Sequence, residues 1–245
     1  MYVRAKGLVI RSVPYKEADL VLTALTDEFG KITVSARGAR RKNSKISAAS
    51  QLFAFSDMVL FERQGRYTLS EAQVIDGFSG LTLDLKRMAL ASYFSEVLCE
   101  SATEGEDAGT DILRLALNCL YALSSGKYAC AAVKTAFELK FASLSGYAPE
   151  LDFCALCGKE LSDCRVDAEA GEAYCPSCAG AGIYFTENAR ECARHIAGCE
   201  LKKLLSFSCG AEEGAALSAF SEKYLLSRLE RGFKTLDFYA KTGEV

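Results

Sequence analysis

The first 80 residues alternate between apolar and polar positions over short stretches, which turn-forming residues separate. Alternation with a period of two predicts β-strands. The expected strands cover residues 2–13, 19–27, 31–37, 52–63 and 66–75. The fourth is expected to break near Ser56 and Asp57, and residues 38–51, which lack apolar periodicity, are expected to form a loop. Five short strands with turns between them predict a small antiparallel barrel, of which the OB-fold is the five-stranded type.

After residue 80 the apolar residues recur every three or four positions, and this spacing predicts helices. The expected helices cover residues 81–98, 112–123, 133–144, about 187–197 and about 212–232. Thr186 is expected to cap the fourth of these helices. The acidic residues 101–110 are expected to form a loop. The chain is therefore divided into a barrel domain over residues 1–80 and a helical domain over residues 81–245.

Four cysteines inside the helical domain follow the pattern C-x2-C, seventeen residues, C-x2-C: Cys154, Cys157, Cys175 and Cys178. Two such pairs on tight turns can place four thiolates at the corners of a tetrahedron, and the spacing is typical of a four-cysteine zinc ribbon. Gly158 and Ala179 follow the pairs, and Pro176 restricts the second turn. We expect one zinc ion that stabilises a ribbon over about residues 152–185, since no coordination position stays open for catalysis. The predicted fold class is α+β, an N-terminal five-stranded OB-fold barrel followed by an α-helical domain with this ribbon.

Two other interpretations of the cysteines stay open. The four residues can be free thiols that match the pattern by chance, or they can form disulfides. We find no signal peptide and no apolar run of membrane-spanning length, so we expect a cytoplasmic chain in which reduced, clustered cysteines favour a metal. Cys164 lies inside the ribbon and is a spare candidate ligand, ranked below the four because it has no partner at C-x2-C spacing.

Positive charge is concentrated in the barrel domain. Residues 1–80 hold twelve Lys and Arg against eight Asp and Glu, whereas residues 81–245 hold seventeen against twenty-four. Five cations fall within nine residues of the expected loop, and no carboxylate lies among them: Arg37, Arg40, Arg41, Lys42 and Lys45. Together with Lys6 and Lys31 they form a candidate surface for a nucleic-acid backbone. The alternative is a loop that is merely solvated.

Aromatic residues suited to base stacking lie in the same domain: Tyr2, Tyr15, Phe29, Phe53, Phe55, Phe61 and Tyr67. Most of them are expected in the barrel core, with one or two facing outward. The charge pattern by itself indicates contact with an anionic backbone and gives no sign that the sequence of bases is read.

Four segments resemble the RecO family of bacterial recombination mediators: KGLVIRSVPYKEADLVLTALTDEFGKITVSARGARRKNSK, LSGYAPELDFCALCGKEL, CPSCA and YLLSRLERGFKTLDFY. The resemblance implies an OB domain followed by a helical domain with a zinc ribbon, in a cytoplasmic, nucleoid-associated protein. It implies binding of single- and double-stranded DNA, strand annealing, binding of the tail of single-strand binding protein, and loading of RecA together with RecR. It also implies that the loop from Arg37 to Lys45 belongs to the DNA-binding surface. Not all members of the family keep the four cysteines.

The resemblance does not identify the residues that contact protein partners. An acidic protein tail requires a basic rim, and the candidates are Lys202, Lys203, Arg228, Arg231 and Lys234. The alternative is that Arg228 and Arg231 only solvate the last helix.

Three classes of function compete. The favoured class is a non-catalytic DNA-binding mediator, and the second is a protein-interaction scaffold whose basic loop contacts an acidic partner. An enzyme is the least favoured, because the chain has one histidine, His195, and we find no nucleophile motif, phosphate-binding loop or open metal position. No small-molecule substrate and no membrane are expected.

Overall fold

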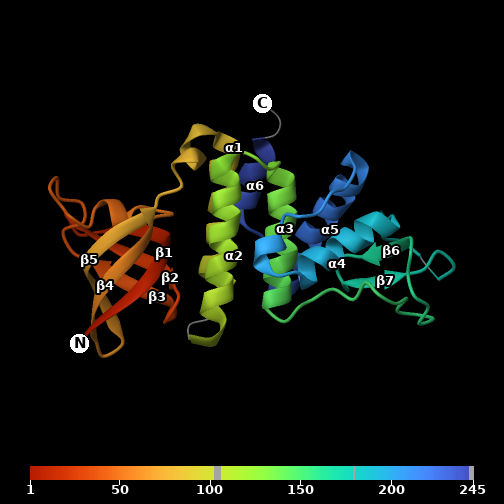
Figure 1. Cartoon of the computed structure of the whole chain (residues 1–245), viewed down its shortest axis with the longest axis horizontal. Coiled ribbons are helices and arrows are strands. Elements are labelled where there is room, and N and C mark those ends of the chain that lie inside the picture. The colour runs from red at the N-terminus through yellow and green to blue at the C-terminus, as the bar shows by residue number, and fades with distance from the viewer. Residues whose placement is uncertain (102–105, 179, 243–245) are drawn as a thin grey trace. The chain divides into compact units, whose positions relative to one another are not determined.

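The computed structural model describes residues 1–101, 106–178 and 180–242. Its first part is a closed five-stranded barrel in the order β1-β2-β3-β5-β4, which confirms the predicted OB-type barrel (Figure 1). The strands are β1 (Tyr2–Tyr15), β2 (Asp19–Thr26), β3 (Gly30–Ala36), β4 (Phe55–Arg63) and β5 (Arg66–Asp76). Four of the five pairings are antiparallel, and β3 pairs with β5 in parallel.

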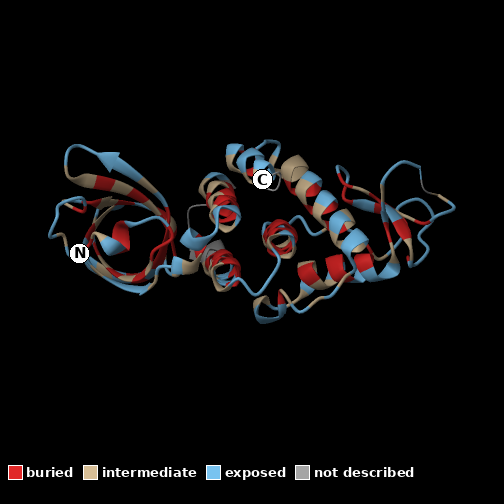
Figure 2. Cartoon of the chain, turned by 90° about the horizontal axis from the view of Figure 1, so that it is seen from above, coloured by how far each residue is buried: buried red, intermediate tan, exposed pale blue. Residues whose placement is uncertain are grey.

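The barrel core follows from the alternation in the sequence. Along β3 and β4 the residues Ile32, Val34, Met58 and Leu60 are buried, and the residues between them are more exposed (Figure 2). Side chains at successive strand positions point to opposite faces, so one face of each strand fills the barrel and the other meets solvent. Truncating one of these buried side chains to alanine costs roughly 2–5 kcal/mol.

The start of β4 differs from the prediction. The strand begins at Phe55 and not at residue 52, because Phe53 adopts a left-handed backbone conformation with φ of 66°. The N–H of Phe53 donates to the carbonyl of Val9 at 2.8 Å, so this residue ends the preceding loop. The ladder to β5 shifts register between Phe55 and Ser56, close to the predicted break. Residues 38–51 form the predicted loop, which is a series of turns and includes a short 3₁₀ helix, Ala48–Ser50.

The chain after the barrel is mostly helical, and the whole chain divides into two compact units. The barrel unit comprises Met1–Ser124 and the chain from Phe233 onward, and the ribbon unit comprises Ser125–Gly232. The helices are α1 (Leu85–Ser101), α2 (Glu106–Ser125), α3 (Cys130–Leu144), α4 (Glu187–Gly198), α5 (Ala211–Leu229) and α6 (Lys234–Lys241). The division into a barrel domain and a helical domain near residue 80, which the hydrophobic pattern predicts, stays a prediction.

Within the barrel unit, α1 packs on the barrel and α6 packs on α1. The Ser95 hydroxyl donates to the carbonyl of Ile10 in β1. The ring centroids of Tyr93 and Phe233 lie 5.7 Å apart, edge to face, and the backbone N–H of Thr235 donates to a Glu96 carboxylate oxygen at 3.1 Å. The last described helix therefore returns to the unit in which the chain begins.

Within the ribbon unit, α3 is buried on almost every side, from Val133 to Ala142. Lys134 Nζ lies 2.9 Å from a carboxylate oxygen of Glu138 and 2.9 Å from one of Glu222 in α5. The Ser221 hydroxyl donates to Glu138 at 2.6 Å. Because Lys134 and Glu138 are almost fully buried, this pairing compensates their loss of hydration while it joins α3 to α5.

Two predictions for the helical part of the chain differ from the structure, one about a loop and one about where a helix ends. The loop predicted over residues 101–110 is helical at Ser101 and again from Glu106, while residues 102–105 lie outside the described part. Helix α2 includes Gly109, and a helix accepts a single glycine at a cost of about 1 kcal/mol. The last predicted helix, about 212–232, ends earlier, where Glu230 adopts a left-handed conformation, and α6 follows as a separate helix.

The ribbon also contains three short strands, β6 (Cys164–Asp167), β7 (Glu172–Tyr174) and β8 (Ile183–Phe185). They form a small antiparallel sheet in the order β7-β6-β8. Strands of three or four residues are too short for a periodic signal, which explains why the sequence predicts the ribbon but not its strands. No helix in the described ranges has both the length and the apolar character needed to cross a membrane.

Candidate metal centre and nucleic-acid interface

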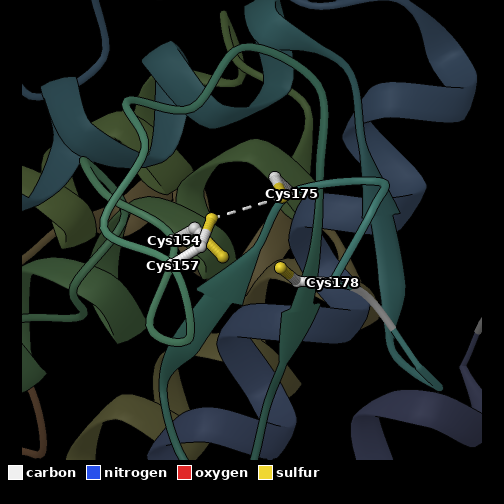
Figure 3. Close-up of side chains that lie close together, drawn as sticks. All are labelled: Cys154, Cys157, Cys175 and Cys178. Carbon is white, nitrogen blue, oxygen red and sulfur yellow. Dashed lines mark hydrogen bonds between the residues drawn. The ribbon is translucent and has the colours of Figure 1, made fainter.

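The four cysteines of the predicted ribbon come together in space (Figure 3). The Sγ atoms of Cys154, Cys157, Cys175 and Cys178 all lie within 4.8 Å of one another. The Sγ atoms of Cys157 and Cys175 are 3.8 Å apart. A tetrahedral ion with metal–sulfur bonds of about 2.3 Å requires about 3.8 Å between neighbouring sulfur atoms. The cluster can therefore hold one metal ion with only small adjustments.

Two tight turns place these thiols. The N–H of Gly158 donates to the carbonyl of Cys154 at 2.8 Å, and Gly158 has a φ of +69°, which favours glycine. In the second pair the N–H of Cys178 donates to the carbonyl of Cys175 at 3.0 Å. Ala179, the small residue expected to assist this turn, lies outside the described residues.

The electrostatics of the cluster favour a cation. Backbone N–H groups of Cys175 and Cys157 lower the pKa of the Cys154 thiol to about 6 and so stabilise its thiolate. Contacts with the thiols of Cys175 and Cys157 raise the pKa of Cys178 to about 12. Four thiolates this close repel one another. The positive charge of a bound divalent cation offsets that repulsion, and the cation thereby favours the deprotonated ligands.

Cys164 is not part of this group. It lies buried in β6, opposite Phe185 of β8, and burial raises its pKa to about 11. The group of metal-ligating side chains found among the described residues contains the four ribbon cysteines and not Cys164.

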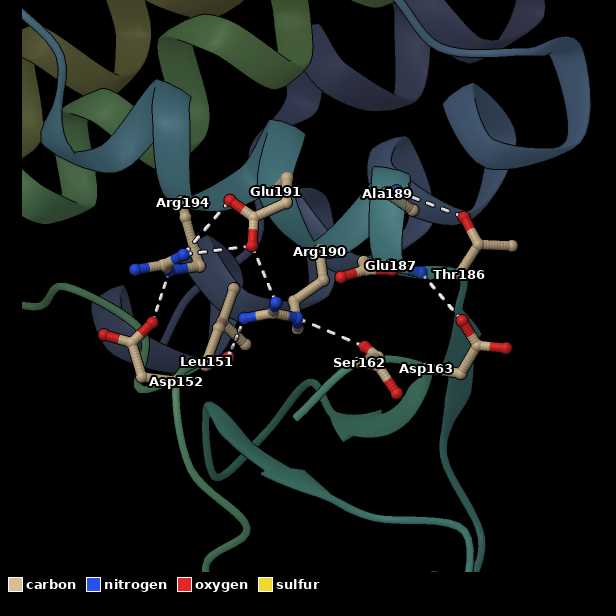
Figure 4. A network of polar contacts seen from close by, with 10 residues as sticks. All are labelled: Leu151, Asp152, Ser162, Asp163, Thr186, Glu187, Ala189, Arg190, Glu191 and Arg194. Carbon is tan, nitrogen blue, oxygen red and sulfur yellow. Dashed lines mark hydrogen bonds and ion pairs between the residues drawn. The ribbon is translucent and has the colours of Figure 1, made fainter. Parts of the chain in front are cut away.

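Arg190 of α4 holds the ribbon on this helix, and no motif in the sequence marks it (Figure 4). Its guanidinium is buried and donates to the carbonyls of Leu151 and Ser162, each at 3.1 Å, and to Glu191 at 2.6 Å. An ion pair between Arg194 and Asp152 lies beside it. The sequence gives only a weak sign that Arg190 is buried, which is its place next to the buried helix positions 189, 192, 193 and 196.

The N-terminus of α4 is capped as predicted. The Thr186 hydroxyl accepts from the N–H of Ala189 at 3.1 Å (Figure 4). The Asp163 carboxylate, from the ribbon, accepts from the N–H of Glu187 at 2.9 Å. Its bonds to Tyr184 and Glu187 hold the pKa of Asp163 below the ordinary value.

The basic loop, Arg37–Lys45, presents all five of its cations to solvent. Its backbone is a series of turns, fixed where the N–H of Arg40 donates to the carbonyl of Ala18 at 3.0 Å and the N–H of Gly38 donates to Asp19 at 2.7 Å. Ala39 is buried and ties the loop to the barrel core. The cations therefore extend from a folded loop beside the β1–β2 turn.

The other two candidate DNA-binding residues lie elsewhere on the barrel. Lys6 is exposed, and its backbone N–H donates to Asp27 in the β2–β3 turn at 2.9 Å. Lys31 is half-buried, and its Nζ donates to the carbonyl of Cys99 in α1 at 2.8 Å. Since the basic loop and the β2–β3 turn meet opposite ends of β2, roughly 23 Å separate them along the strand. Lys31 and the basic loop thus do not form one patch.

Comparison with known proteins identifies the family. One family model, described as "Recombination protein O N terminal", matches residues 1–78, and a second, "Recombination protein O C terminal", matches residues 82–237. The chain belongs to the RecO family. Together the two matches cover the barrel, α1 to α5 and the first half of α6.

Curated RecO family members resemble the chain over nearly its whole length. A "DNA repair protein RecO" of Acetivibrio thermocellus is 30% identical over 241 residues, covering 97% of this chain and 96% of that protein. The protein of the same name from Symbiobacterium thermophilum is 32% identical and covers 95% and 94%. That of Alkaliphilus metalliredigens is 28% identical and covers 98% and 100%. The chain is thus a DNA repair protein of the RecO family.

The partner-binding candidates of this RecO family member occupy different environments. Arg228 in α5 is half-buried: its guanidinium lies 5.2 Å from the Tyr224 ring centroid and donates to the carbonyl of Glu169 in the ribbon. Arg231 is exposed at the end of the ribbon unit. Lys234 is exposed at the start of α6, in the barrel unit. The role of all three in partner binding stays a prediction.

Proposed function

We propose that this RecO family member is a non-catalytic recombination mediator that binds single- and double-stranded DNA through the basic loop. The observation that carries the proposal is the exposure of five cations on a folded loop without a neutralising partner. Among the ion pairs of the described residues, none involves a side chain of the basic loop. A phosphate backbone supplies the missing negative charge.

The basic loop also provides a way to promote strand annealing. Two DNA strands repel each other through their phosphates, and a cationic surface that neutralises one backbone lowers this repulsion. Phosphate contacts leave the base edges free to pair. The basic loop suits this role because it is anchored to the barrel through its backbone while its charged side chains reach solvent.

We further propose that the metal held by the four cysteines is zinc. Four thiolates in a tetrahedron match the preference of this ion, and no position remains for a water molecule. The ion stabilises the ribbon, and through Arg190 the ribbon is held on α4. The ribbon unit and α6 are where we expect the protein partners: RecR, the acidic tail of single-strand binding protein and, indirectly, RecA. Arg228, Arg231 and Lys234 are the candidate contacts.

Neutralising part of the basic loop tests the DNA-binding proposal. The variant Arg40→Gln/Arg41→Gln/Lys42→Gln should bind single- and double-stranded DNA more weakly and anneal complementary strands more slowly in the presence of single-strand binding protein. The matched control is Lys127→Gln/Lys159→Gln/Lys223→Gln, which removes three exposed cations from the ribbon unit. Unchanged DNA affinity in the loop variant would favour a scaffold whose loop contacts an acidic protein.

A further inference from the structure

The barrel carries a second surface, a groove of about 590 Å³ next to the basic loop. Its lining comes from β1, β3, β4 and β5, and Arg37, the first residue of the basic loop, borders it. We call this surface the barrel groove. OB-folds commonly bind oligonucleotides on the face of strands 2 and 3 and beside the loops that join strands 1 to 2 and 4 to 5. The barrel groove shares the β4–β5 hairpin with that surface, and most of its lining lies on β4 and β5, away from the face of strands 2 and 3.

Two exposed aromatic rings form one wall of the barrel groove. Tyr2 and Phe61 stand directly opposite each other on β1 and β4, with ring centroids 5.2 Å apart and planes tilted by 60°. The exposed fractions are 68% for Tyr2 and 37% for Phe61. Rings this exposed contribute little to the barrel core, but their faces suit the stacking of an unpaired base.

Arginines supply the rest of the surface. Arg63 and Arg66 are partners across the β4–β5 hairpin, and both line the barrel groove together with Arg37. Like charges directly opposite in a sheet destabilise it. No aspartate or glutamate lines the barrel groove, and no ion pair of the described residues involves these three arginines. The arrangement therefore favours a bound anion that lies between or beside the guanidinium groups.

We propose that the barrel groove is a subsite for single-stranded DNA, in which one unpaired base stacks on Tyr2 and Phe61 and the flanking phosphates contact Arg37, Arg63 and Arg66. The proposal rests on the proposed function and adds a contact to the base. A base pair inside a duplex is stacked on both faces by its neighbours, so it cannot use these rings. The barrel groove thus gives the barrel a preference for single strands, while the basic loop serves both forms of DNA.

Tryptophan fluorescence provides a direct test, because the chain contains no tryptophan. The variant Tyr2→Trp places one indole in the barrel groove, and oligothymidine should quench its fluorescence as a base stacks on it. The control is Tyr121→Trp on α2, where the parent tyrosine is 62% exposed and does not line the groove. No quenching in Tyr2→Trp, or equal quenching in both variants, would overturn the proposal.

A second variant separates this proposal from the function on which it rests. Tyr2→Leu/Phe61→Leu keeps apolar bulk on the strands and should lower affinity for single-stranded oligothymidine about tenfold, with duplex affinity changed less than about twofold. Thermal unfolding checks that the barrel is intact. Parent-like affinity for single strands would refute the barrel groove alone, whereas failure of the unmodified protein to bind any DNA would refute the proposed function.

Discussion

Arg190 and the arginines of the basic loop differ in the partners that surround them. The guanidinium of Arg190 is buried and donates to two backbone carbonyls of the ribbon, whereas the side chains of Arg37 and Arg41 meet solvent. The sequence could predict the loop arginines as a cluster, because clustering is visible in the chain. It could not predict Arg190, because its carbonyl partners lie 28 and 39 residues away and carry no side-chain signature.

Replacing Arg190 should therefore destabilise the protein strongly. Arg190→Leu leaves the carbonyls of Leu151 and Ser162 without their donor, at a cost of roughly 2–4 kcal/mol in the free energy of unfolding. Arg194→Gln, one turn further along α4, removes more exposed ion pairs and should cost at most about 1 kcal/mol. Urea unfolding of both variants measures the difference, and similar losses would contradict this role of Arg190.

Glu213 gives the ribbon unit a predictable dependence on pH. Its carboxylate accepts from the Thr186 hydroxyl at 2.6 Å, the Gly210 N–H at 2.9 Å and the Asn188 amide at 2.8 Å, which joins the N-termini of α4 and α5. These bonds, that to Thr186 first, lower the pKa of Glu213 from its ordinary value of 4.5. A lowered folded-state pKa stabilises the protein above the unfolded value, and this contribution is lost as the pH falls through the folded value.

The expected result is that Glu213→Gln unfolds more easily than the parent protein at pH 7 and that this difference shrinks below pH 4.5. Glu212→Gln, the neighbouring change on the same helix, should show no such pH-dependent difference. Urea unfolding at several pH values measures both. A difference for Glu213→Gln that is constant with pH would show that its carboxylate charge is not what joins the two helices.

Among the elements, the ribbon is the one that we expect to depend most on a bound ion. Its strands have three or four residues each, and its two C-x2-C turns meet at four thiols that lie within 4.8 Å of one another. The variant Cys154→Ser/Cys157→Ser should lose bound zinc and have a lower melting temperature. Cys164→Ala, a change in the same ribbon, should keep its zinc.

Elemental analysis and thermal unfolding measure these effects. A purified parent protein without zinc would contradict the zinc proposal. If chelation abolishes DNA binding before it unfolds the ribbon, the metal has more than a structural role.

A substitution in the β4–β5 hairpin tests whether Arg63 and Arg66 repel each other in the barrel groove. Arg66→Glu replaces a like-charge pair with an opposite-charge pair across the hairpin, next to Arg63. The expected gain is about 0.2–1 kcal/mol, with a melting temperature higher by about 1–4 °C, together with weaker binding of single-stranded DNA. Arg66→Gln, which only removes the charge, should lie between the two. A lower melting temperature for Arg66→Glu would show that the two arginines do not repel each other.

Elements with a long periodic pattern could be predicted from the sequence, and short or interrupted ones could not. The five barrel strands have between 7 and 14 residues, and their alternation reveals them. The strands of the ribbon and the start of α2 give weaker signals. Helix α6 has only eight residues and begins shortly after α5 ends, so its apolar pattern is too short to give a separate helical signal. The left-handed Glu230 that separates the helices cannot be read from the sequence.

At the scale of the whole molecule, the chain has two compact units with different chemistry. The barrel unit carries the basic loop and the barrel groove, and the ribbon unit carries the metal cluster. The strongest sequence motif, the four cysteines, thus lies in a different unit from the surface that we propose for DNA. Lys31 shows what the sequence alone does not reveal. Its charge predicts a part in a DNA-binding surface, but its Nζ donates to a backbone carbonyl of α1.

The central claim is that the basic loop binds DNA through phosphate contacts, and the salt dependence of binding tests it most directly. Each contact with single-stranded DNA adds about 0.7 to the slope of log affinity against log salt concentration. The variant Arg40→Gln/Arg41→Gln/Lys42→Gln should bind oligothymidine more weakly, with a slope shallower by about 2, whereas Lys127→Gln/Lys159→Gln/Lys223→Gln should match the parent protein. A loop variant with the affinity and slope of the parent protein would contradict the account.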